Sequence, residues 1–348
     1  MNKINICYAS SNEYAPYTGI SLFSCLENNS RFVDKVFILS FGIKDDNREK
    51  LRYVVERHNC EFVIIDAIPI LKPIFEKINL DTFRGSYATF SRAFISYLIP
   101  EGIESLLYID SDTIVDGSIE ELCGLKMTNP DKVYAAVIGT NHYTRNNPEL
   151  ILDNGNKTYY QAGVIFFNLI NWRKYNCSVQ IEDYIKNHAS SYRNADQTVI
   201  NNVIDENLVE PLHPKYNYWG HIYRGARLWY QMRLGGFWSD KVIKEAIDSP
   251  VIIHYKGHVV HPWKKDSISS LYDRYHFYKK STPWRDDIEY SIYYDYDKNC
   301  ETNELRKRYK NEIRYLRYHP FLLYIIEYII PSLAQIKHNL FSNGRNKH

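Results

Sequence analysis

The chain has 348 residues, 45% of them hydrophobic, and a formal net charge of +2. This length suits one large domain with an extension, or two modest domains. The nearly balanced charge gives no sign of a nucleic-acid partner or of a strongly acidic one, so we expect no nucleic-acid binding.

The first part of the chain alternates short apolar runs with amphipathic stretches. Apolar runs at 4–9, 35–40 and 61–65 predict buried strands. Helical spacing of apolar residues predicts helices over 14–26 and 45–57. Strands that alternate with helices predict right-handed βαβ units and a parallel sheet.

The same alternation continues through the middle of the chain. A helix is predicted over 91–98, and the later strands are predicted at 104–109, 133–138, 163–168 and 251–255. We therefore predict an α/β catalytic domain over residues 1–265.

From residue 266 the composition changes, and 266–348 is predicted to be a Tyr- and Lys-rich C-terminal extension. From Asn303 onward there are nine Lys or Arg and three Glu, and the apolar run 320–330 lies inside this basic stretch. The run is too short to span a bilayer. A basic helix followed by an apolar one is typical of a peripheral anchor on an anionic membrane surface. The alternative is a helix packed on the catalytic domain or on a second subunit.

Cysteine usage and the N-terminus bear on the compartment. The six cysteines are scattered and form no CxxC pair, which fits reduced thiols. The N-terminus lacks the long apolar stretch of a signal peptide. We therefore predict a cytoplasmic protein, peripheral on the inner face of the cytoplasmic membrane.

Two carboxylates, Asp110 and Asp112, follow the predicted strand at 104–109. In open α/β sheets, ligands bind beyond the carboxyl ends of the strands. Two aspartates placed there could hold a divalent ion, which would bridge a diphosphate and neutralise charge on the leaving group. Mn²⁺ or Mg²⁺ suits oxygen ligands, and an added histidine favours Mn²⁺. An isolated Asp-x-Asp pair is also common as a turn former or helix cap.

Five segments stand out in chain order: 9–17, 91–94, Asp110-Ser111-Asp112, 160–173 with 194–198, and 253–264. In this order they resemble the retaining galactosyl- and glucosyltransferases of glycosyltransferase family 8. This family includes bacterial lipooligosaccharide α-galactosyltransferases and glycogenin. The resemblance covers roughly residues 4–264. It implies a GT-A type fold, a Rossmann-like mixed sheet flanked by helices, followed here by a small C-terminal helical extension.

The resemblance also implies an activity. It implies transfer of a hexose, galactose or glucose, from a UDP-sugar to a glycan or glycolipid acceptor, such as a lipooligosaccharide or lipopolysaccharide precursor. The implied cofactor is Mn²⁺, with Mg²⁺ as an alternative.

The first segment resembles the loop that lies against uridine in the family. The resemblance implies donor contacts from Ala9, Ser10, Ser11 and Asn12, and stacking of Tyr14 on the base. Ser11 and Asn12 stand where many members have two aspartates, and both side chains can still form hydrogen bonds with uracil or ribose.

The second, third and fifth segments carry the charged groups. Arg92 matches an arginine that reaches the donor sugar and diphosphate, and we place it among the catalytic residues. Asp110, Asp112 and His254 match the metal ligands, and Asp110 also counts among the donor-binding residues. Ser111 matches a residue near the ribose.

The fourth segment resembles the Asn-Ala-Gly strand of the family, with Gln161 in place of the Asn, followed by Ala162 and Gly163. The glycine allows close approach of the backbone to the donor sugar. Asp196 is implied to bind sugar hydroxyls and Gln197 to lie near the anomeric carbon, and we place both among the catalytic residues with Arg92. Alternatively, Asp196 is an acid at the start of a helix.

The fifth segment also carries a phosphate cradle and a departure from the family pattern. Gly257 and the backbone after it are implied to hold phosphate. His261 stands where the family has a lysine before Pro-Trp, so His261 or Lys264 is predicted to face the β-phosphate. The loop 139–142 lacks the aspartate that is common in the family, so sugar or acceptor recognition is expected to differ.

Retention of configuration is compatible with a covalent intermediate or with front-face attack. A covalent route needs a carboxylate near the anomeric carbon, and the matching residue is Gln197. We therefore predict front-face departure, with the leaving phosphate as the base.

Two other interpretations remain open. One is a catalytically silent binder of nucleotide sugars or glycans on the same fold. The other is a nucleotidyltransferase, which is expected to carry a Gly-rich phosphate loop, whereas residues 9–22 contain a single glycine, Gly19.

Overall fold

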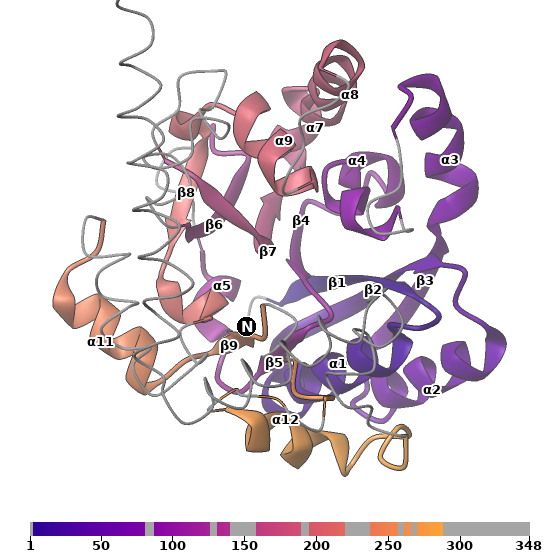
Figure 1. The fold of residues 1–348 in the computed structure, drawn as a ribbon, viewed down its shortest axis with the longest axis vertical. Coiled ribbons are helices and arrows are strands. Elements are labelled where there is room, and N and C mark those ends of the chain that lie inside the picture. Colours follow the sequence, from indigo (N-terminus) through magenta and orange to yellow (C-terminus); the bar gives the residue numbers. More distant parts are fainter. Residues whose placement is uncertain are drawn as a thin grey trace, which may run out of the picture.

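We analysed a computed structural model, which describes residues 3–80, 87–125, 131–139, 158–188, 195–219, 237–256, 261–264, 267, 269 and 271–287. Its centre is a seven-stranded sheet in the order β3-β2-β1-β4-β7-β6-β8. A second sheet has two strands, β5 and β9. Figure 1 shows helices on both sides of the large sheet.

The first half of the large sheet is parallel. It consists of β1 (Ile4–Ser11), β2 (Val33–Phe41), β3 (Glu61–Asp66) and β4 (Ser105–Ile109). The second half is mixed. Here β7 (Tyr160–Asn168) is antiparallel to both β4 and β6 (Tyr134–Ile138), and β8 (Val209–Leu212) is parallel to β6.

Side chains of the strands alternate between two hydrophobic cores, one on each face of the sheet. Within β4, Leu107 and Ile109 belong to one core, and Leu106 and Tyr108 to the other. This alternation follows from the two-residue period of a strand. Both faces are covered, so the strands carry apolar residues in continuous runs.

Helices cover both faces. The first core contains α1 (Ala15–Asn29), α2 (Asp45–Glu56) and α5 (Glu120–Cys123). The second contains α3 (Ala67–Lys77), α4 (Ile95–Leu98), α7 (Leu169–Lys174), α8 (Cys177–Asn187) and α9 (Ala195–Val203). In Figure 1, α1 and α2 lie below β1–β3, and α4, α7, α8 and α9 lie above them.

The small sheet joins distant parts of the chain. β5 (Thr113–Val115) begins directly after Asp112, and it pairs in antiparallel fashion with β9 (Ile252–His254). In this register Thr113 lies opposite His254. The helix α11 (Asp240–Asp248) leads into β9.

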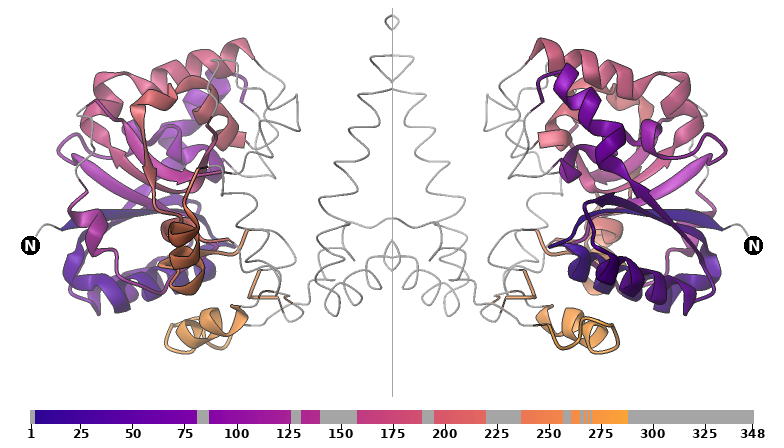
Figure 2. Two further views of the ribbon diagram at one scale, coloured as in Figure 1. Left: turned by 90° about the vertical axis from the view of Figure 1, so that its left-hand side faces the viewer. Right: turned by 90° about the vertical axis from the view of Figure 1, so that its right-hand side faces the viewer.

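The described part of the extension packs on the first core. Helix α12 (Tyr272–Lys279) contacts α1, and the two views of Figure 2 show it at the end of the molecule where α1 lies. Tyr275, Tyr278 and Trp284 are buried in the same cluster as the apolar residues of α1. The division at residue 265 stays a prediction, while residues 271–287 share a core with the strands before it.

Most of the predicted strands are confirmed, with ends that differ by a few residues. The helix predicted over 91–98 is confirmed only in its second half. The chain forms a 3₁₀ turn at Ala88–Arg92 and then the separate short α4. Bonds from each amide to the carbonyl three residues earlier, such as Ala93 N to Phe90 O at 3.0 Å, replace the α-helical pattern. The parallel pairing predicted for the first part of the chain is confirmed for β1–β4. The mixed sheet that the resemblance implies is also confirmed, because β7 returns antiparallel beside β4.

Two further predictions meet the structure only in part. The five cysteines among the described residues, Cys7, Cys25, Cys60, Cys123 and Cys177, are free thiols. Within the described ranges, no helix has the length and apolarity needed to cross a bilayer. The basic and apolar tail from Asn303 lies outside the described residues.

Candidate active site

Three potential metal ligands lie together at the carboxyl end of β4. One ligand atom from each of Asp110, Asp112 and His254 lies within 4.8 Å of the others. His254 Nε2 is 3.2 Å from a carboxylate oxygen of Asp112 and 4.0 Å from one of Asp110. Ligands of an octahedral ion at about 2.1 Å lie roughly 3 Å apart, so this set of donors fits a divalent cation. Two carboxylates and one imidazole suit Mn²⁺ well.

Backbone pairing places these ligands. The amide of Asp110 donates to the carbonyl of Gly163 on β7 at 2.8 Å, and the amide of Tyr255 donates to the carbonyl of Asp112 at 2.8 Å. The first bond anchors the acidic turn to the large sheet. The second continues the pairing of β5 with β9, and so brings His254 to Asp112.

Asn217 orients the histidine ligand, and sequence reasoning missed it. Its side-chain oxygen lies 2.8 Å from Nδ1 of His254, and Asn217 is fully buried. An amide oxygen accepts, so this contact places the proton of the imidazole on Nδ1 and leaves the lone pair of Nε2 for a metal. No sequence motif marks Asn217, because it reaches His254 through folding across 37 residues.

Gly163 makes room for His254. A Cβ atom on Gly163 would lie 2.4 Å from Cε1 and 2.7 Å from Nδ1 of the His254 ring, and 3.0 Å from a carboxylate oxygen of Asp110. The resemblance implied a glycine that lets the donor sugar approach. The structure adds a second reason for glycine, since any side chain here would displace the ring.

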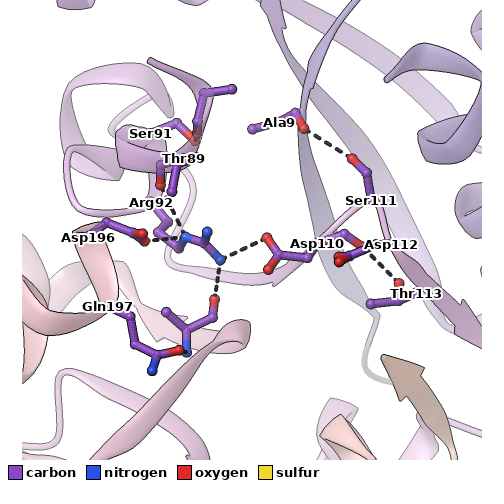
Figure 3. Close-up of polar contacts among 12 residues, drawn as sticks. Ala9, Thr89, Ser91, Arg92, Asp110, Ser111, Asp112, Thr113, Asp196 and Gln197 are labelled. Carbon is purple, nitrogen blue, oxygen red and sulfur yellow. Dashed lines mark hydrogen bonds and ion pairs between the residues drawn. The ribbon is translucent and has the colours of Figure 1, made fainter. Parts of the chain in front are cut away.

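Arg92 lies between two carboxylates (Figure 3). Its Nη1 donates to Asp110 at 2.7 Å and to the carbonyl of Ala162 at 2.6 Å, and its Nε pairs with Asp196. The 3₁₀ turn delivers the side chain, and α9 delivers Asp196 from its first turn. Arg92 and Asp196 are both buried, with exposed fractions of 7% and 2%, so Arg92 is not the solvated side chain of a surface helix.

Burial and neighbouring charges shift the pKa values of the three acids in different directions. Burial raises the pKa of Asp196 to about 7, with Arg92 opposing the shift and Asp110 adding to it. Burial also raises the pKa of Asp110, again against Arg92. For Asp112, His254 outweighs the effect of burial and holds the pKa at about 2. Among the described residues, Asp110 and Asp196 thus share Arg92, while Asp112 pairs with His254, and a divalent ion would offset the negative charge of these acids.

This arrangement predicts a pH-dependent loss of stability in Arg92→Met. Without the guanidinium, Asp196 and Asp110 keep their burial but lose their partner, which should cost about 3–5 kcal/mol. Because the raised pKa of Asp196 favours its protonated form, the wild-type protein loses stability from this group as pH rises from about 4 through 7. The deficit of the variant should be small at pH 5 and large at pH 8.

Urea unfolding at both pH values, with chelator present, measures this effect. The double variant Arg92→Met/Asp196→Asn should recover part of the loss at pH 8. An equal deficit at the two pH values would contradict the assignment of Asp196 as the titrating group.

The predicted nucleotide loop is tied to the acidic turn by hydroxyl groups. The Ser111 hydroxyl donates to the carbonyl of Ala9 at 3.2 Å and lies 2.8 Å from the hydroxyl of Thr18. Thr18 also donates to Ser10 at 2.8 Å. The resemblance implied that Ser111 lies near the ribose. In the structure its hydroxyl joins the end of β1 to the turn after β4.

Aromatic rings connect the first predicted segment with the fifth. Tyr14, which is 47% exposed, meets Tyr17 edge to face at 5.5 Å. Tyr17 stacks on Trp263 at 4.0 Å, and His261 stacks on the same indole at 4.4 Å. Tyr14 thus stands at the exposed end of this aromatic series, where a base can stack on its exposed ring.

The amide side chains near β7 differ in their contacts. The Oε1 of Gln197 accepts from the amide of Ala162 at 3.1 Å. Gln161 is 3% exposed, and neither of its amide atoms has a hydrogen-bond partner among the described residues. A buried amide without hydrogen bonds lowers the stability of the folded protein unless a ligand supplies the missing partners.

The remaining predicted residues belong to the fifth segment. His261 lies close enough to Asp112 to contribute to the lowered pKa of that carboxyl. Lys264 is buried, and burial lowers the pKa of its ammonium group. Gly257 lies outside the described residues. The assignment of His261 or Lys264 to the β-phosphate stays a prediction.

Comparison with known proteins decides the family. The family model for glycosyl transferase family 8 matches residues 5–267. The chain belongs to this family. The resemblance of the five segments is confirmed, and the family match ends before α12.

Curated relatives of this family 8 glycosyltransferase are distant in sequence. The lipopolysaccharide 1,2-glucosyltransferase of Escherichia coli K12 is 22% identical over 298 residues, which cover 82% of this chain and 80% of the relative. A Haemophilus influenzae protein, with no name more specific than glycosyltransferase, is 23% identical over 213 residues. That match covers 58% of this chain, and the chain spans only 59% of that relative.

A solved structure shows the fold of the family 8 chain. The galactosyltransferase LgtC, crystallised with donor and acceptor sugar analogs, matches with a TM-score of 0.65 at 19% identity. The match covers 81% of this chain and 99% of LgtC. The predicted GT-A type fold is therefore confirmed.

Proposed function

We propose that this family 8 glycosyltransferase transfers galactose or glucose from a UDP-sugar, with retention, to a lipooligosaccharide or lipopolysaccharide precursor. The observation that carries the proposal is the convergence of Asp110, Asp112 and His254 beside the Arg92–Asp196 pair. The names of the E. coli glucosyltransferase and of LgtC support a hexose donor and a glycan acceptor.

The metal site has the ligands that a nucleotide-sugar transferase needs. Asp110, Asp112 and Nε2 of His254 would hold Mn²⁺, with Mg²⁺ as the alternative. Bound there, the ion would act as a Lewis acid that neutralises charge on the diphosphate leaving group. Arg92 and either His261 or Lys264 would add positive charge beside it.

The contacts of the two candidate nucleophiles favour front-face attack. The carbonyl oxygen of Gln197 already accepts a hydrogen bond from the backbone, and an amide is a weak nucleophile. The carboxylate of Asp196 is paired with Arg92, and its pKa is raised to about 7. It is therefore protonated more readily than an ordinary aspartate. We therefore propose that Asp196 binds sugar hydroxyls and that the leaving phosphate takes the proton of the acceptor. Intact mass spectra that reveal a trapped hexosyl-enzyme would contradict this route.

Gln161 is the side chain whose missing hydrogen bonds the sugar donor is best placed to supply. Its amide is buried and unpartnered among the described residues. It replaces the asparagine that is usual in the family, and its extra methylene shifts where the amide meets the hexose. Together with Gly163 and Ala162, it forms the strand that we propose faces the sugar.

We also propose that the basic tail holds the enzyme on anionic membrane, where lipid-linked acceptors grow. Deleting residues 303–348 should abolish sedimentation with vesicles of anionic lipid while sparing metal-dependent hydrolysis of the donor. The full chain on vesicles of neutral lipid is the control. A truncated chain that loses donor hydrolysis would instead assign the tail a structural role.

Nucleotide release tests the main proposal. The purified protein would be mixed with Mn²⁺ and a panel of nucleotide sugars, with Asp110→Ala/Asp112→Ala as the control. We expect release from UDP-galactose or UDP-glucose that is lost in the double variant. If no sugar nucleotide is turned over even after a glycolipid extract is added, the silent binding protein suggested by Ser11, Gln161 and His261 is the better interpretation.

A further inference from the structure

Trp284, which lies beyond the last residue of the family match, is buried against the helix that comes after the predicted nucleotide loop. Trp284 is 1% exposed, and the family match ends at residue 267. A Cβ atom on Gly19 of α1 would lie 2.0 Å from the indole ring, so the ring fills the space that the glycine leaves. Trp284 therefore packs directly on the helix that follows the predicted nucleotide loop.

A chain of hydrogen bonds runs from this indole to the loop. The Nε1 of Trp284 donates to Oδ1 of Asn47 at 3.0 Å. The Nδ2 of Asn47 donates to Oδ1 of Asn12 at 3.1 Å and to the carbonyl of Asn12 at 3.3 Å. Asn12 lies in the loop that we propose binds the donor nucleotide.

The direction of this chain is fixed by its donors. An indole N–H can only donate, so Asn47 must turn its oxygen to Trp284 and its NH₂ group to Asn12. The backbone amide of Lys44 also donates to Oδ1 of Asn12, at 3.0 Å. The side-chain oxygen Oδ1 of Asn12 thus accepts two hydrogen bonds. The side-chain group that remains for a ligand is the donor Nδ2.

We propose that Trp284 is a positioning residue for the nucleotide, acting through Asn47 to present Asn12 as a hydrogen-bond donor. A donor that meets position 4 of the ring matches the carbonyl oxygen of uracil there. It does not match the amino group that cytosine carries at the same position. The extension thereby contributes to the choice of base, although it lies outside the family match. This inference rests on the proposed binding of UDP at this loop.

Binding of UDP and of CDP in the presence of Mn²⁺, followed by calorimetry, tests the inference. Trp284→Phe keeps a ring against Gly19 but removes the donor. If Asn12 then no longer donates to the base, the loss of that one hydrogen bond, about 1 kcal/mol, corresponds to roughly fivefold weaker UDP binding. Asn47→Asp keeps an acceptor for Trp284 but removes the donation to Asn12. It should weaken UDP binding at least as much and reduce the preference for UDP over CDP.

Trp172→Phe is the matched control. Trp172 is also fully buried, and its Nε1 donates to Ser178 at 3.0 Å, on the opposite face of the sheet. This variant should lose comparable thermal stability yet bind UDP and CDP as the wild type does.

Different outcomes would overturn the proposed function and the proposed role of Trp284. A wild-type protein that binds neither nucleotide overturns the proposed function and this inference with it. If the wild type binds UDP, but Trp284→Phe and Asn47→Asp keep its affinity and its UDP-to-CDP ratio, the inference alone is overturned. Equal weakening of UDP binding in Trp172→Phe would also overturn it, because the effect would then follow from stability rather than from the loop.

Discussion

Asp112→Asn is expected to lower nucleotide release from the UDP-sugar by about 10²–10³-fold or more. The substitution keeps the size of the side chain and the backbone bond from Tyr255. It removes the one carboxylate of the site whose pKa lies near 2, and which is therefore ionised throughout the working pH range. Mn²⁺ loses a charged ligand that lies 3.2 Å from its histidine partner. Mn²⁺ affinity, measured by electron paramagnetic resonance, should fall together with turnover.

Asp116→Asn is the control for that experiment. Asp116 follows β5 on the same segment, but its carboxylate accepts from Tyr278 at 2.7 Å and pairs with Arg274 at 3.4 Å, away from the metal ligands. This variant should bind Mn²⁺ normally and lose only some stability. If Asp112→Asn bound Mn²⁺ with wild-type affinity, Asp112 would not be a metal ligand.

Gly163→Ala is expected to be nearly as damaging, although it adds a single methyl group. The new Cβ would overlap the His254 ring at 2.4 Å, and the ring is held from behind by Asn217. It cannot yield as the end of a flexible side chain can, so either the ring or β7 must shift. Because metal sites tolerate little displacement of a ligand, we expect loss of Mn²⁺ binding and at least a roughly hundredfold loss of turnover.

Gly102→Ala serves as the comparison for this substitution. A Cβ on Gly102 would meet nothing within 4 Å. Its thermal stability and turnover should match the wild type. Full activity in Gly163→Ala would mean that His254 is not a ligand in the working enzyme.

Local sequence signals were enough to predict the strands and the acidic turn. Buried strands such as β1 and β4 carry unbroken apolar runs, and Asp110 and Asp112 follow one of them directly. Only the first half of the helix predicted over 91–98 was wrong, because apolar spacing alone does not show that Arg92 lies between Asp110 and Asp196. The burial of a guanidinium between two acids is a tertiary effect, and it overrides local periodicity.

Other parts of the site could not be predicted from one sequence. Asn217 looks like any loop asparagine until folding places it behind His254. The contact between Trp284 and Gly19 joins two distant positions, neither of which belongs to a motif. The family resemblance supplied roles for residues up to Lys264, and it was silent about α12 and the residues after it.

The pairing of β5 with β9 also sets when the site can exist during synthesis. The seven strands of the large sheet are complete once β8 has left the ribosome, but β9 and its histidine follow only later. A nascent chain at that stage can collapse around both faces of the sheet while it still lacks the third ligand. The proposed capacity to bind a divalent ion would therefore be acquired late, and a bound ion would then stabilise the folded chain by mass action. Metal binding would thus link the middle of the family match, where Asp110 and Asp112 lie, to His254 near its end, in time as well as in space.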